Sequence, residues 1–388
     1  MSSGRIVLVA LLTIAVNCSA FVARGATLTT LYSFTDGADG GVPLTGLTYH
    51  DGIVYGTTVE GGISNGGTIF TVDPSTGAES VVYDFPLATG QQDPNQLRYH
   101  GGAFYGTTRQ AGPTSSGTVF KFNPKSRAAT VLHTFGVDSD GSQPQSGLVF
   151  RGTLYGTTTG GGDSRDGTIF KVDPKTGGEA VLYNFKGERS DGAGPGQLID
   201  KDGIFYGVTG DSSGVLECGG IYRFDPTTGI MSVLYTVTCE ADGALPTSLA
   251  YEGGNLYVPT NNGSTFNAVC SGGCGAILKI NAATGAETVI YSFNGADGGN
   301  PFGPLTKQGG FLYGTTIIGG GTGCGGAGCG TIFKLNPVNG KVQMVYSFTG
   351  GADGKFPKSG VISQGGALYG TTSLGGVNLY GTVFKLIP

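Results

Sequence analysis

Residues 147–185 read GLVFRGTLYGTTTGGGDSRDGTIFKVDPKTGGEAVLYNF, and this stretch decides the fold. It contains four short runs rich in aromatic and β-branched residues, GLVF, TLYGTT, GTIFKV and EAVLYNF, separated by turn residues. Runs of this length, bounded by Gly, Pro and Asp, are typical of β-strands. In DPKTG, the Asp side chain caps the turn, Pro fixes φ and Gly supplies a positive φ, so the last two runs form a hairpin. The stretch therefore predicts four antiparallel strands.

The same unit occurs seven times, marked by three short motifs in a constant order. Copies of the first motif, YGTT or a variant of it, are 50 to 56 residues apart and begin at Tyr55, Tyr105, Tyr155, Tyr206, Tyr257, Tyr313 and Tyr369. The second motif, GTIF or similar, begins at Gly67, Gly117, Gly167, Gly219, Gly275, Gly330 and Gly381. The third, LYSF or similar, begins at Leu31, Val82, Leu132, Leu182, Leu234, Ile290 and Val345. Four strands in each repeat of roughly 50 residues are typical of a propeller blade. The sequence predicts an all-β protein, a seven-bladed β-propeller of four-stranded antiparallel blades.

The two ends of the chain predict how the ring closes. The first LYSF run, at Leu31, precedes the first YGTT, whereas the last GTVF run, at Gly381, has no fourth strand after it. These fragments complete one blade, so we expect residues 28–34 to pair beside residues 382–386 and remove two exposed sheet edges. An open β-solenoid, which also stacks repeats, is the competing architecture.

The repeat consensus resembles a known family. GGxLYGTT, GTIFKxDPxTG and xxVLYSF together closely resemble the GloVer-type tandem repeat of exported bacterial proteins described as choice-of-anchor tandem repeat proteins. The resemblance covers essentially the whole chain after the first 26 residues, and the period is also kelch-like. It implies export and a propeller-like array. It implies no established activity, and it carries over no catalytic residues.

Composition fits a repetitive all-β protein and excludes one class of partner. Gly accounts for 75 of the 388 residues, a content that would suggest disorder if the chain were aperiodic. The net charge is −5 and no run of like charges occurs, so the sequence has no basic footprint for a phosphate backbone. We expect a monomer that does not bind nucleic acid.

The first 26 residues have the layout of a secretory signal peptide. Arg5 precedes an apolar stretch over residues 6–16, and small residues offer cleavage after Ala20 or Ala26. The apolar stretch is too short to span a bilayer, and we expect no transmembrane segment. A lipidated Cys18 is the alternative interpretation. The sequence thus predicts a signal peptide over 1–26, one propeller domain over 27–388, and a secreted or periplasmic/extracellular protein.

Six cysteines outside the signal region agree with an oxidising compartment. Two pairs are close enough in sequence to close single loops. The remaining pair would join the loop before a third strand to the exit of the fourth, and these emerge on the same face of a blade. A metal site is the weaker alternative, because the pairs lie on different blades and lack partner histidines. The expected disulfides are Cys218–Cys239, Cys270–Cys274 and Cys324–Cys329.

The sequence contains no recognisable catalytic motif, since GxSxG, HExxH and P-loop patterns are absent. His50 and His100 occupy the same repeat position, and His133 stands where other repeats have Tyr. The three histidines are therefore expected on different blades, which argues against a copper site of converging imidazoles. We assign no catalytic residue and no metal site.

Six connections between repeats carry Asp-Gly, with Pro four positions after the Asp. These carboxylates could ligate Ca²⁺ or cap the turns, and turn capping is favoured because the spacing does not match a dense calcium loop. We therefore expect no cofactor, with calcium as the alternative. The aspartates are Asp39, Asp140, Asp191, Asp242, Asp297 and Asp353.

Two long loops predict where a ligand binds. Between YGTT and the third strand, five repeats have eight or nine residues, whereas repeats five and six have fourteen and thirteen. Ordering a long Gly-rich loop costs conformational entropy, and a cysteine staple lowers that cost. Neutral insertion is the alternative explanation. We expect a binding surface that includes Asn261, Asn262, Phe266, Asn267, Ile317 and Ile318.

Three classes of function follow from these observations. The leading class is an exported, non-catalytic binding or scaffold propeller that recognises a glycan, an envelope component or a protein. The second is a secreted carbohydrate-active enzyme, a hydrolase or lyase, that uses loop carboxylates such as Glu60, Glu217 and Glu240. The third is a structural, surface-associated repeat protein.

Overall fold

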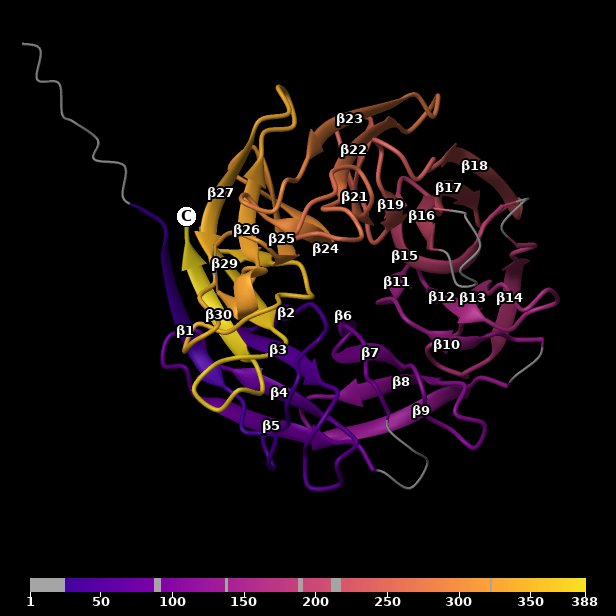
Figure 1. Cartoon of the computed structure of the whole chain (residues 1–388). Coiled ribbons are helices and arrows are strands. Elements are labelled where there is room, and N and C mark those ends of the chain that lie inside the picture. The colour runs from indigo at the N-terminus through magenta and orange to yellow at the C-terminus, as the bar shows by residue number, and fades with distance from the viewer. Residues whose placement is uncertain (1–24, 87–91, 137–138, 188–190, 211–217, 322) are drawn as a thin grey trace, which may run out of the picture.

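Seven β-sheets stand in a ring around a central axis (Figure 1). The computed structural model describes residues 25–388 except 87–91, 137–138, 188–190, 211–217 and 322. The predicted signal peptide falls on residues 1–24 and the two that follow, so nearly all of it lies outside the described residues. The described part of the chain has no helix that is both long and apolar enough to cross a membrane.

Each sheet is one blade, and within a blade the chain runs from the inner strand outward. Blade 1 comprises β2 (Thr48–His50), β3 (Ile53–Thr58), β4 (Thr68–Val72) and β5 (Glu79–Asp84). Blade 2 comprises β6 (Arg98–His100), β7 (Ala103–Thr108), β8 (Thr118–Asn123) and β9 (Ala128–Thr134). In blade 3 the inner strand is split into β10 (Ser142–Pro144) and β11 (Val149–Phe150), followed by β12 (Leu154–Gly160), β13 (Thr168–Val172) and β14 (Glu179–Asn184).

The remaining blades repeat this order. Blade 4 comprises β15 (Ala193–Lys201), β16 (Ile204–Gly210), β17 (Gly220–Asp225) and β18 (Ile230–Thr236). Blade 5 comprises β19 (Ala244–Pro246), β20 (Ala250–Glu252), β21 (Asn255–Asn262), β22 (Ala276–Asn281) and β23 (Glu287–Ser292). Blade 6 comprises β24 (Gly299–Gln308), β25 (Phe311–Ile318), β26 (Thr331–Leu335) and β27 (Val342–Ser347), with a 3-10 turn, η2 (Cys324–Gly326), in its long loop.

The last blade joins the two ends of the chain, as the sequence predicts. Blade 7 comprises β28 (Ile362–Gln364), β29 (Ala367–Thr372), β30 (Thr382–Ile387) and β1 (Thr27–Ser33). Strand β1 pairs antiparallel with β30, from Thr27 opposite Ile387 to Ser33 opposite Thr382. The prediction of a closed, seven-bladed propeller is confirmed, and the open solenoid is wrong.

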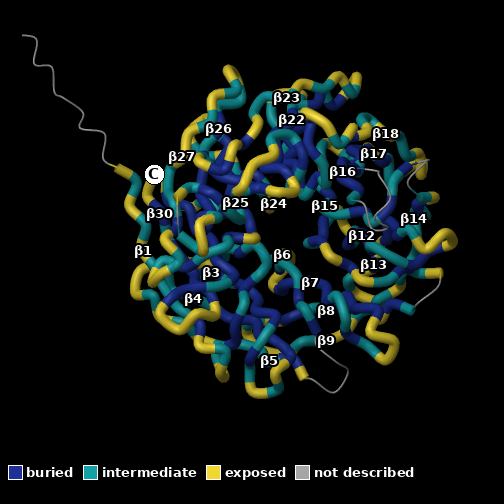
Figure 2. Tube along the Cα trace, viewed as in Figure 1, coloured by how far each residue is buried: buried dark blue, intermediate teal, exposed yellow. Residues whose placement is uncertain are grey.

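The hydrophobic core lies between neighbouring blades (Figure 2). Between blades 3 and 4, Ile169 and Phe185 pack with Leu198, Phe205 and Phe224, and four of these five side chains are fully buried. Ile169 belongs to the GTIF motif and Phe185 to the LYSF motif, so both markers supply the interface. Burying an aromatic or aliphatic side chain of this size stabilises the fold by about 1.5–3 kcal/mol.

The glycine of YGTT leaves room for the aromatic ring opposite it. Gly156 pairs with Phe170 across β12 and β13, and a Cβ at Gly156 would lie 2.6 Å from the ring. Blade 5 departs from the motif with YVPT, and there Val258 stands opposite Leu278 instead of a Phe. The larger residue is accommodated because its partner is smaller, which conserves the packed volume.

The glycine of GTIF has a second role, because it touches the next blade. At Gly167, φ is +97°, and a Cβ there would lie 2.2 Å from the Thr158 carbonyl oxygen and 2.6 Å from Cδ of Pro195 in blade 4. The same contact occurs at all seven interfaces. The pairs are Gly67–Pro94, Gly117–Pro144, Gly167–Pro195, Gly219–Pro246, Gly275–Pro301, Gly330–Pro357 and Gly381–Pro43.

Three disulfides fasten the loops of blades 4, 5 and 6. They are the pairs expected from the blade register, Cys218–Cys239, Cys270–Cys274 and Cys324–Cys329. The first joins the entry of β17 to the exit of β18, and the other two lie within the long loops of blades 5 and 6. Such bridges stabilise a fold mainly by restricting the unfolded chain.

Three blade interfaces bury a glutamate beside an aspartate of the preceding blade. At the start of β5, Glu79 lies near Asp39, which accepts a hydrogen bond from the Tyr32 hydroxyl. Among the described residues, Oε1 of Glu79, Glu179 and Glu287 is buried and makes no hydrogen bond. Burial, and then the neighbouring Asp, raises the pKa of Glu79 and of Glu179 to about 7. These carboxyls are therefore protonated below neutral pH.

Replacing Gly167 by Ala should destabilise the protein much more than replacing Gly152 by Ala. Both glycines have a positive φ, but a Cβ at Gly152 has no atom within 4 Å. We expect a loss of about 1–2 kcal/mol for G152A from backbone strain alone, and about 2–4 kcal/mol for G167A from strain plus overpacking. Thermal unfolding measures the difference. Equal losses would show that the contact with Pro195 is unimportant.

The glutamates at the interfaces should make stability depend on pH. Between pH 4.5, the ordinary glutamate pKa, and about 7, the unfolded chain loses protons that the folded chain keeps. Stability should therefore fall as pH rises through this window. The double variant Glu79→Gln, Glu179→Gln stays neutral, so its Tm should exceed that of wild type at pH 8 and equal it at pH 4.5. A constant difference at both pH values would contradict this assignment.

Candidate functional site

A strained turn directs each inner segment toward the centre of the ring. In every blade the residue before the inner proline has φ between +43° and +58°, a region that L-residues rarely adopt, least of all β-branched ones such as Val42. In six of the seven blades the backbone N–H of this residue donates to the preceding blade, for example from Phe356 to the Cys329 carbonyl at 2.9 Å. The seven residues are Val42, Asp93, Gln143, Gly194, Leu245, Asn300 and Phe356.

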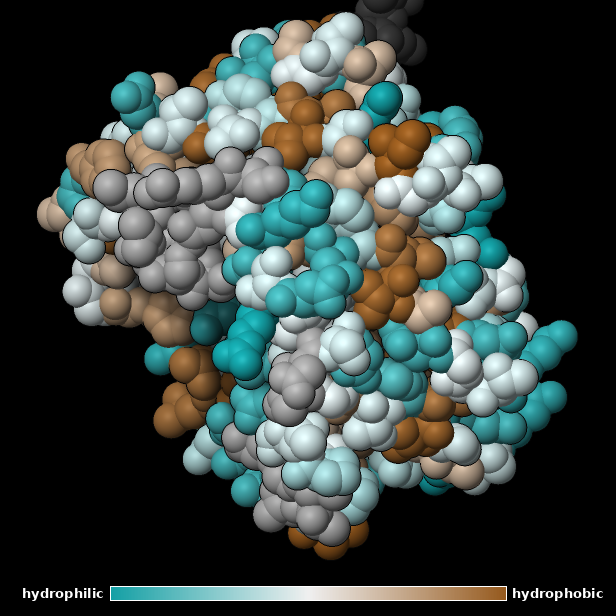
Figure 3. All heavy atoms as spheres, turned by 90° about the vertical axis from the view of Figure 1, so that its right-hand side faces the viewer, coloured by the Kyte–Doolittle hydropathy of each residue, from teal (hydrophilic) through white to brown (hydrophobic). Residues whose placement is uncertain are grey.

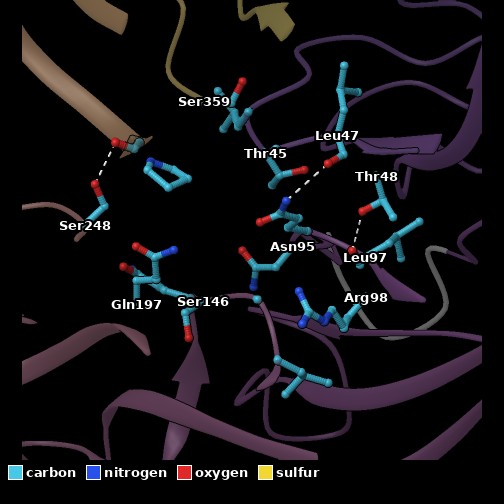
Figure 4. Close-up of a pocket in the computed structure, with 18 of the residues that line it drawn as sticks. Thr45, Leu47, Thr48, Asn95, Leu97, Arg98, Ser146, Gln197, Ser248 and Ser359 are labelled. Atoms are coloured by element: carbon cyan, nitrogen blue, oxygen red, sulfur yellow. Dashed lines mark hydrogen bonds between the residues drawn. The ribbon is translucent and has the colours of Figure 1, made fainter. Parts of the chain in front are cut away.

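The inner segments enclose a central cavity of about 1030 Å³ (Figure 4). All seven blades contribute to its wall, so the cavity lies on the axis of the ring. The wall is formed by residues 44–49, 93–98, 145–150, 196–200, 247–248, 302–304, 358–359 and 362–364, together with Val59 and Arg109. A cavity of this size accommodates a ligand of several sugar units or a short peptide.

Buried hydroxyl groups on the second strands connect the blades to one another. The first Thr of YGTT lies at the end of the second strand and donates to the inner segment of the next blade, as from Thr157 to the Gly196 carbonyl at 2.7 Å. We call this set of bonds the polar ring. Its other threonine donors are Thr57, Thr107, Thr315 and Thr371.

Where the threonine is replaced, another side chain maintains the polar ring. Blade 5 has Pro259 at this position, and Ser248 of the same blade donates to the Gly303 carbonyl of blade 6 at 2.6 Å (Figure 4). Between blades 4 and 5, Gln197 accepts from the N–H of Leu249 at 3.1 Å. The wall itself contains other hydroxyl and amide side chains, among them Thr45, Asn95 and Ser146.

Charged side chains are distributed unevenly around the cavity. Arg98 and Lys358 are exposed to it, and among the described residues neither has a carboxylate oxygen within 4.0 Å. Arg109 receives support from Gln145, whose amide oxygen accepts from Nε and Nη2 at 3.2 Å once the amide is oriented to satisfy both groups. Asp200 accepts from the Gly203 N–H at 3.0 Å.

Carboxyl groups with raised pKa values lie at the edge of the cavity in blades 1 and 2. Burial raises the pKa of Asp93, and the nearby Arg109 opposes that rise. Burial raises the pKa of Glu60, and the charges of Asp36 and Asp93 add to it. Carboxyl groups with perturbed pKa values beside a cavity are candidates for acid or base catalysis. Of the other carboxylates considered from sequence, Glu240 lies on a different blade and Glu217 lies outside the described residues.

The structure brings the two long loops of blades 5 and 6 together through the connection between these blades. Ile318 packs in the same hydrophobic cluster as Cys270, Cys274 and Val269 of the blade 5 loop. Gly320 N–H donates to the carbonyl of Gly295 in the connection at 3.0 Å. The two loops therefore lie next to each other. Much of each loop, however, is packed against the other loop and against the connection between the blades.

Most of the asparagines expected to bind a ligand make hydrogen bonds within the protein. Asn300 Nδ2 donates to the Asn261 carbonyl at 2.6 Å and to Asn262 Oδ1 at 3.0 Å. Asn267 donates to the Asn294 carbonyl at 2.8 Å and caps its own turn. Phe266 is 62% exposed and is the largest apolar side chain that this loop presents to solvent. The loop surface stays a prediction, with Phe266 as its best probe.

Elsewhere, exposed apolar side chains are scattered. On the flank that faces right in Figure 1, hydrophobic residues occur in separate small groups among hydrophilic ones (Figure 3). This flank therefore offers no single apolar surface for a partner.

The histidines and aspartates singled out in the sequence make contacts within and between the blades. His50 stacks on Tyr99 and His100 on Phe150, each on the next blade, with ring centroids 3.5 Å apart. Asp242 caps its connection by accepting from the Tyr235 hydroxyl at 2.8 Å and the Thr238 N–H at 2.7 Å. In blade 2, His133 replaces the Tyr and lies 3.2 Å from Asp140. The calcium hypothesis for these aspartates stays a prediction.

Sequence reasoning missed the central cavity, although one signal pointed to it. Each repeat begins with Pro, two or three variable residues and then Leu or Val, as in Pro144 to Leu148 and Pro357 to Val361. The variable positions are the cavity wall, and their side chains differ from blade to blade. Constant Pro and Leu or Val residues on either side of variable polar positions indicate that the variable side chains line a cavity and are not part of the core.

The arrangement of blades is similar to that of several solved structures. An oligogalacturonate lyase in complex with manganese aligns over 95% of this chain and 94% of that chain, with a TM-score of 0.60 and 12% identity. A computationally designed protein, Ika8, aligns over 88% of this chain and 96% of that chain, with a TM-score of 0.51 and 14% identity. At such identities the likeness shows the fold alone.

Sequence comparison identifies the repeat itself. No curated protein matches the chain. The sequence model of the Gloeobacter/Verrucomicrobia repeat matches residues 20–151 and 149–327, which together cover most of the chain. The resemblance inferred from YGTT and GTIF is thereby confirmed, and the chain belongs to the Gloeobacter/Verrucomicrobia repeat family.

Proposed function

We propose that this protein is an exported binding propeller that holds an oligosaccharide in its central cavity. The observation that carries the proposal is the composition of the cavity wall, to which six of the seven blades contribute hydroxyl or amide side chains. Saccharides are recognised by such groups, because each sugar hydroxyl both donates and accepts hydrogen bonds. Aromatic rings of the wall, including Phe302 and Phe150, supply apolar faces on which a sugar ring can stack.

Export is part of the same proposal. Three disulfides require an oxidising compartment to form and persist, and the first 26 residues have the layout of a signal peptide. A polysaccharide-rich cell exterior would present the proposed ligand. A glycan is favoured over the other partners considered, an envelope component or a protein, because the cavity wall combines hydrogen-bonding side chains with aromatic rings.

A carbohydrate-active enzyme is the second candidate, and one observation favours it. Asp93 lines the cavity, and the pKa of Glu60 is raised by burial and by the charges of Asp36 and Asp93. Perturbed carboxyl groups beside a cavity are typical of catalytic sites. The lyase with a similar fold acts on oligogalacturonate, so that polymer belongs among the substrates to be tried.

Two single substitutions should distinguish the cavity from the loop surface. Phe302 is 37% exposed in the cavity wall, and Phe266 is 62% exposed on the blade 5 loop. Losing a stacking ring costs about 1 kcal/mol, so F302A should weaken saccharide binding about fivefold, whereas F266A should leave it unchanged. Retention on a panel of immobilised polysaccharides, followed by calorimetry, gives both values. The opposite result would place the ligand on the loops of blades 5 and 6.

The enzymatic candidate makes a separate prediction. If Asp93 takes part in catalysis, purified protein should release new reducing ends or unsaturated products from a polysaccharide, and D93N should lower that rate at least about a hundredfold. Asp51→Asn, at an exposed hairpin turn, is the matched control. If the protein binds polysaccharides but releases no product from any member of the panel, the proposed binding function stands and the enzymatic candidate is rejected.

A further inference from the structure

The positive charges of the cavity wall exceed its negative charges, although the chain as a whole is acidic. The sequence has 22 Lys and Arg against 27 Asp and Glu, so a cationic surface is not expected by composition. The wall nevertheless contains Arg98, Arg109 and Lys358 against Asp93 and Asp200. The cavity is therefore the place where an anionic group would find compensating charge.

The two carboxylates do not neutralise these cations. Asp200 belongs to blade 4, where it accepts from the Gly203 N–H at 3.0 Å and lies 3.5 Å from Arg151. Asp93 lies near Arg109 but makes no ion pair within 4.0 Å among the described residues. Arg98 and Lys358 are left without a carboxylate partner in the described structure.

The cations also lie on one side of the cavity. Lys358 belongs to the inner segment of blade 7, and Arg98 and Arg109 belong to blade 2, so a single arc formed by blades 7, 1 and 2 carries all three. The opposite arc carries no lining cation and presents Asp200, which is paired with Arg151, and neutral groups such as Gln197 and Ser248 (Figure 4). A ligand that carries acid groups along one edge and hydroxyls along the other would match this distribution.

We infer that the cavity selects a carboxylated oligosaccharide, an oligomer of uronic acids, whose carboxylates face Arg98 and Lys358. The inference rests on the proposed saccharide-binding function and adds the chemical class of the ligand. A guanidinium donates two parallel hydrogen bonds to a carboxylate, and an ammonium supplies a compact point charge. Hydroxyl and amide groups of the wall, such as Thr45 and Gln197, contact the rest of the sugar.

The test compares two ligands that differ only in charge. Oligogalacturonate and oligomannuronate are titrated by calorimetry against their carboxyl-reduced forms, which keep the length and linkage but have CH₂OH in place of the carboxylate. Wild type should bind at least one acid oligomer more tightly than its reduced form. Raising the ionic strength should weaken binding of the acid oligomer and leave that of the reduced oligomer unchanged.

Variants identify the cations responsible. Arg98→Gln and Lys358→Gln should each lower affinity for the acid oligomer about three- to fivefold, without changing affinity for the reduced oligomer. Arg98→Lys keeps the charge and should retain most of the affinity. Lys125→Gln removes one positive charge from an exposed turn outside the cavity and should change neither value. Thermal unfolding confirms that each variant is folded.

The outcomes separate the two proposals. Equal affinity of wild type for an acid oligomer and its reduced form overturns the inference and leaves saccharide binding in place. The inference is also overturned if Lys125→Gln weakens binding of the acid oligomer as much as Arg98→Gln does. The effect would then reflect the net charge of the protein and not a contact in the cavity. Failure of every oligosaccharide, acid or neutral, to bind would overturn the proposed function itself.

Discussion

The contact between a glycine and the proline of the next blade is the constraint on which the rest of this ring depends. Each of the seven glycines that open a third strand has a positive φ and leaves no space for a Cβ, because a carbonyl and a proline ring occupy that space. This contact sets how closely blades approach, and the proline in turn begins the inner segment. Blade spacing, the direction of the inner segments and the width of the cavity therefore follow from one repeated pair of residues.

The sequence was enough to derive the architecture, because the signals for it are periodic and carried by residue types with distinct backbone behaviour. Gly167, Phe170 and Asp173 each recur with a steric or hydrogen-bonding reason, and the ring closure followed from counting strands. The cavity could not be derived in this way. Its wall is made by Thr45, Asn95, Ser146 and their equivalents, whose residue type is not constant from blade to blade. The left-handed turns before them include Val42 and Leu245, which no turn preference predicts.

For the long loops, the sequence indicates the region but not the contacts of its side chains. Their length and cysteines predict a binding surface, which stays a prediction, and the two loops do meet. Side-chain chemistry alone did not reveal that Asn262 and Asn267 are engaged by Asn300, in the inner strand of blade 6, and by Asn294, in the connection before it. A polar residue in a Gly-rich loop has to satisfy backbone groups that no strand supplies, and this need competes with any ligand for the same amide.

Blade 7, which contains both ends of the propeller, constrains the order in which the molecule can fold. Because Thr27 pairs with Ile387, the first residues of the propeller acquire their neighbours only when the last strand exists. Contacts between such distant parts of a chain are slow to form, since a very large loop must close first. Until then β1 and β30 each present an unpaired edge of the kind that recruits other chains. A chain emerging N-terminus first from a translocation pore would hold six blades before it could complete the seventh, so its period of greatest vulnerability to aggregation ends only with full release.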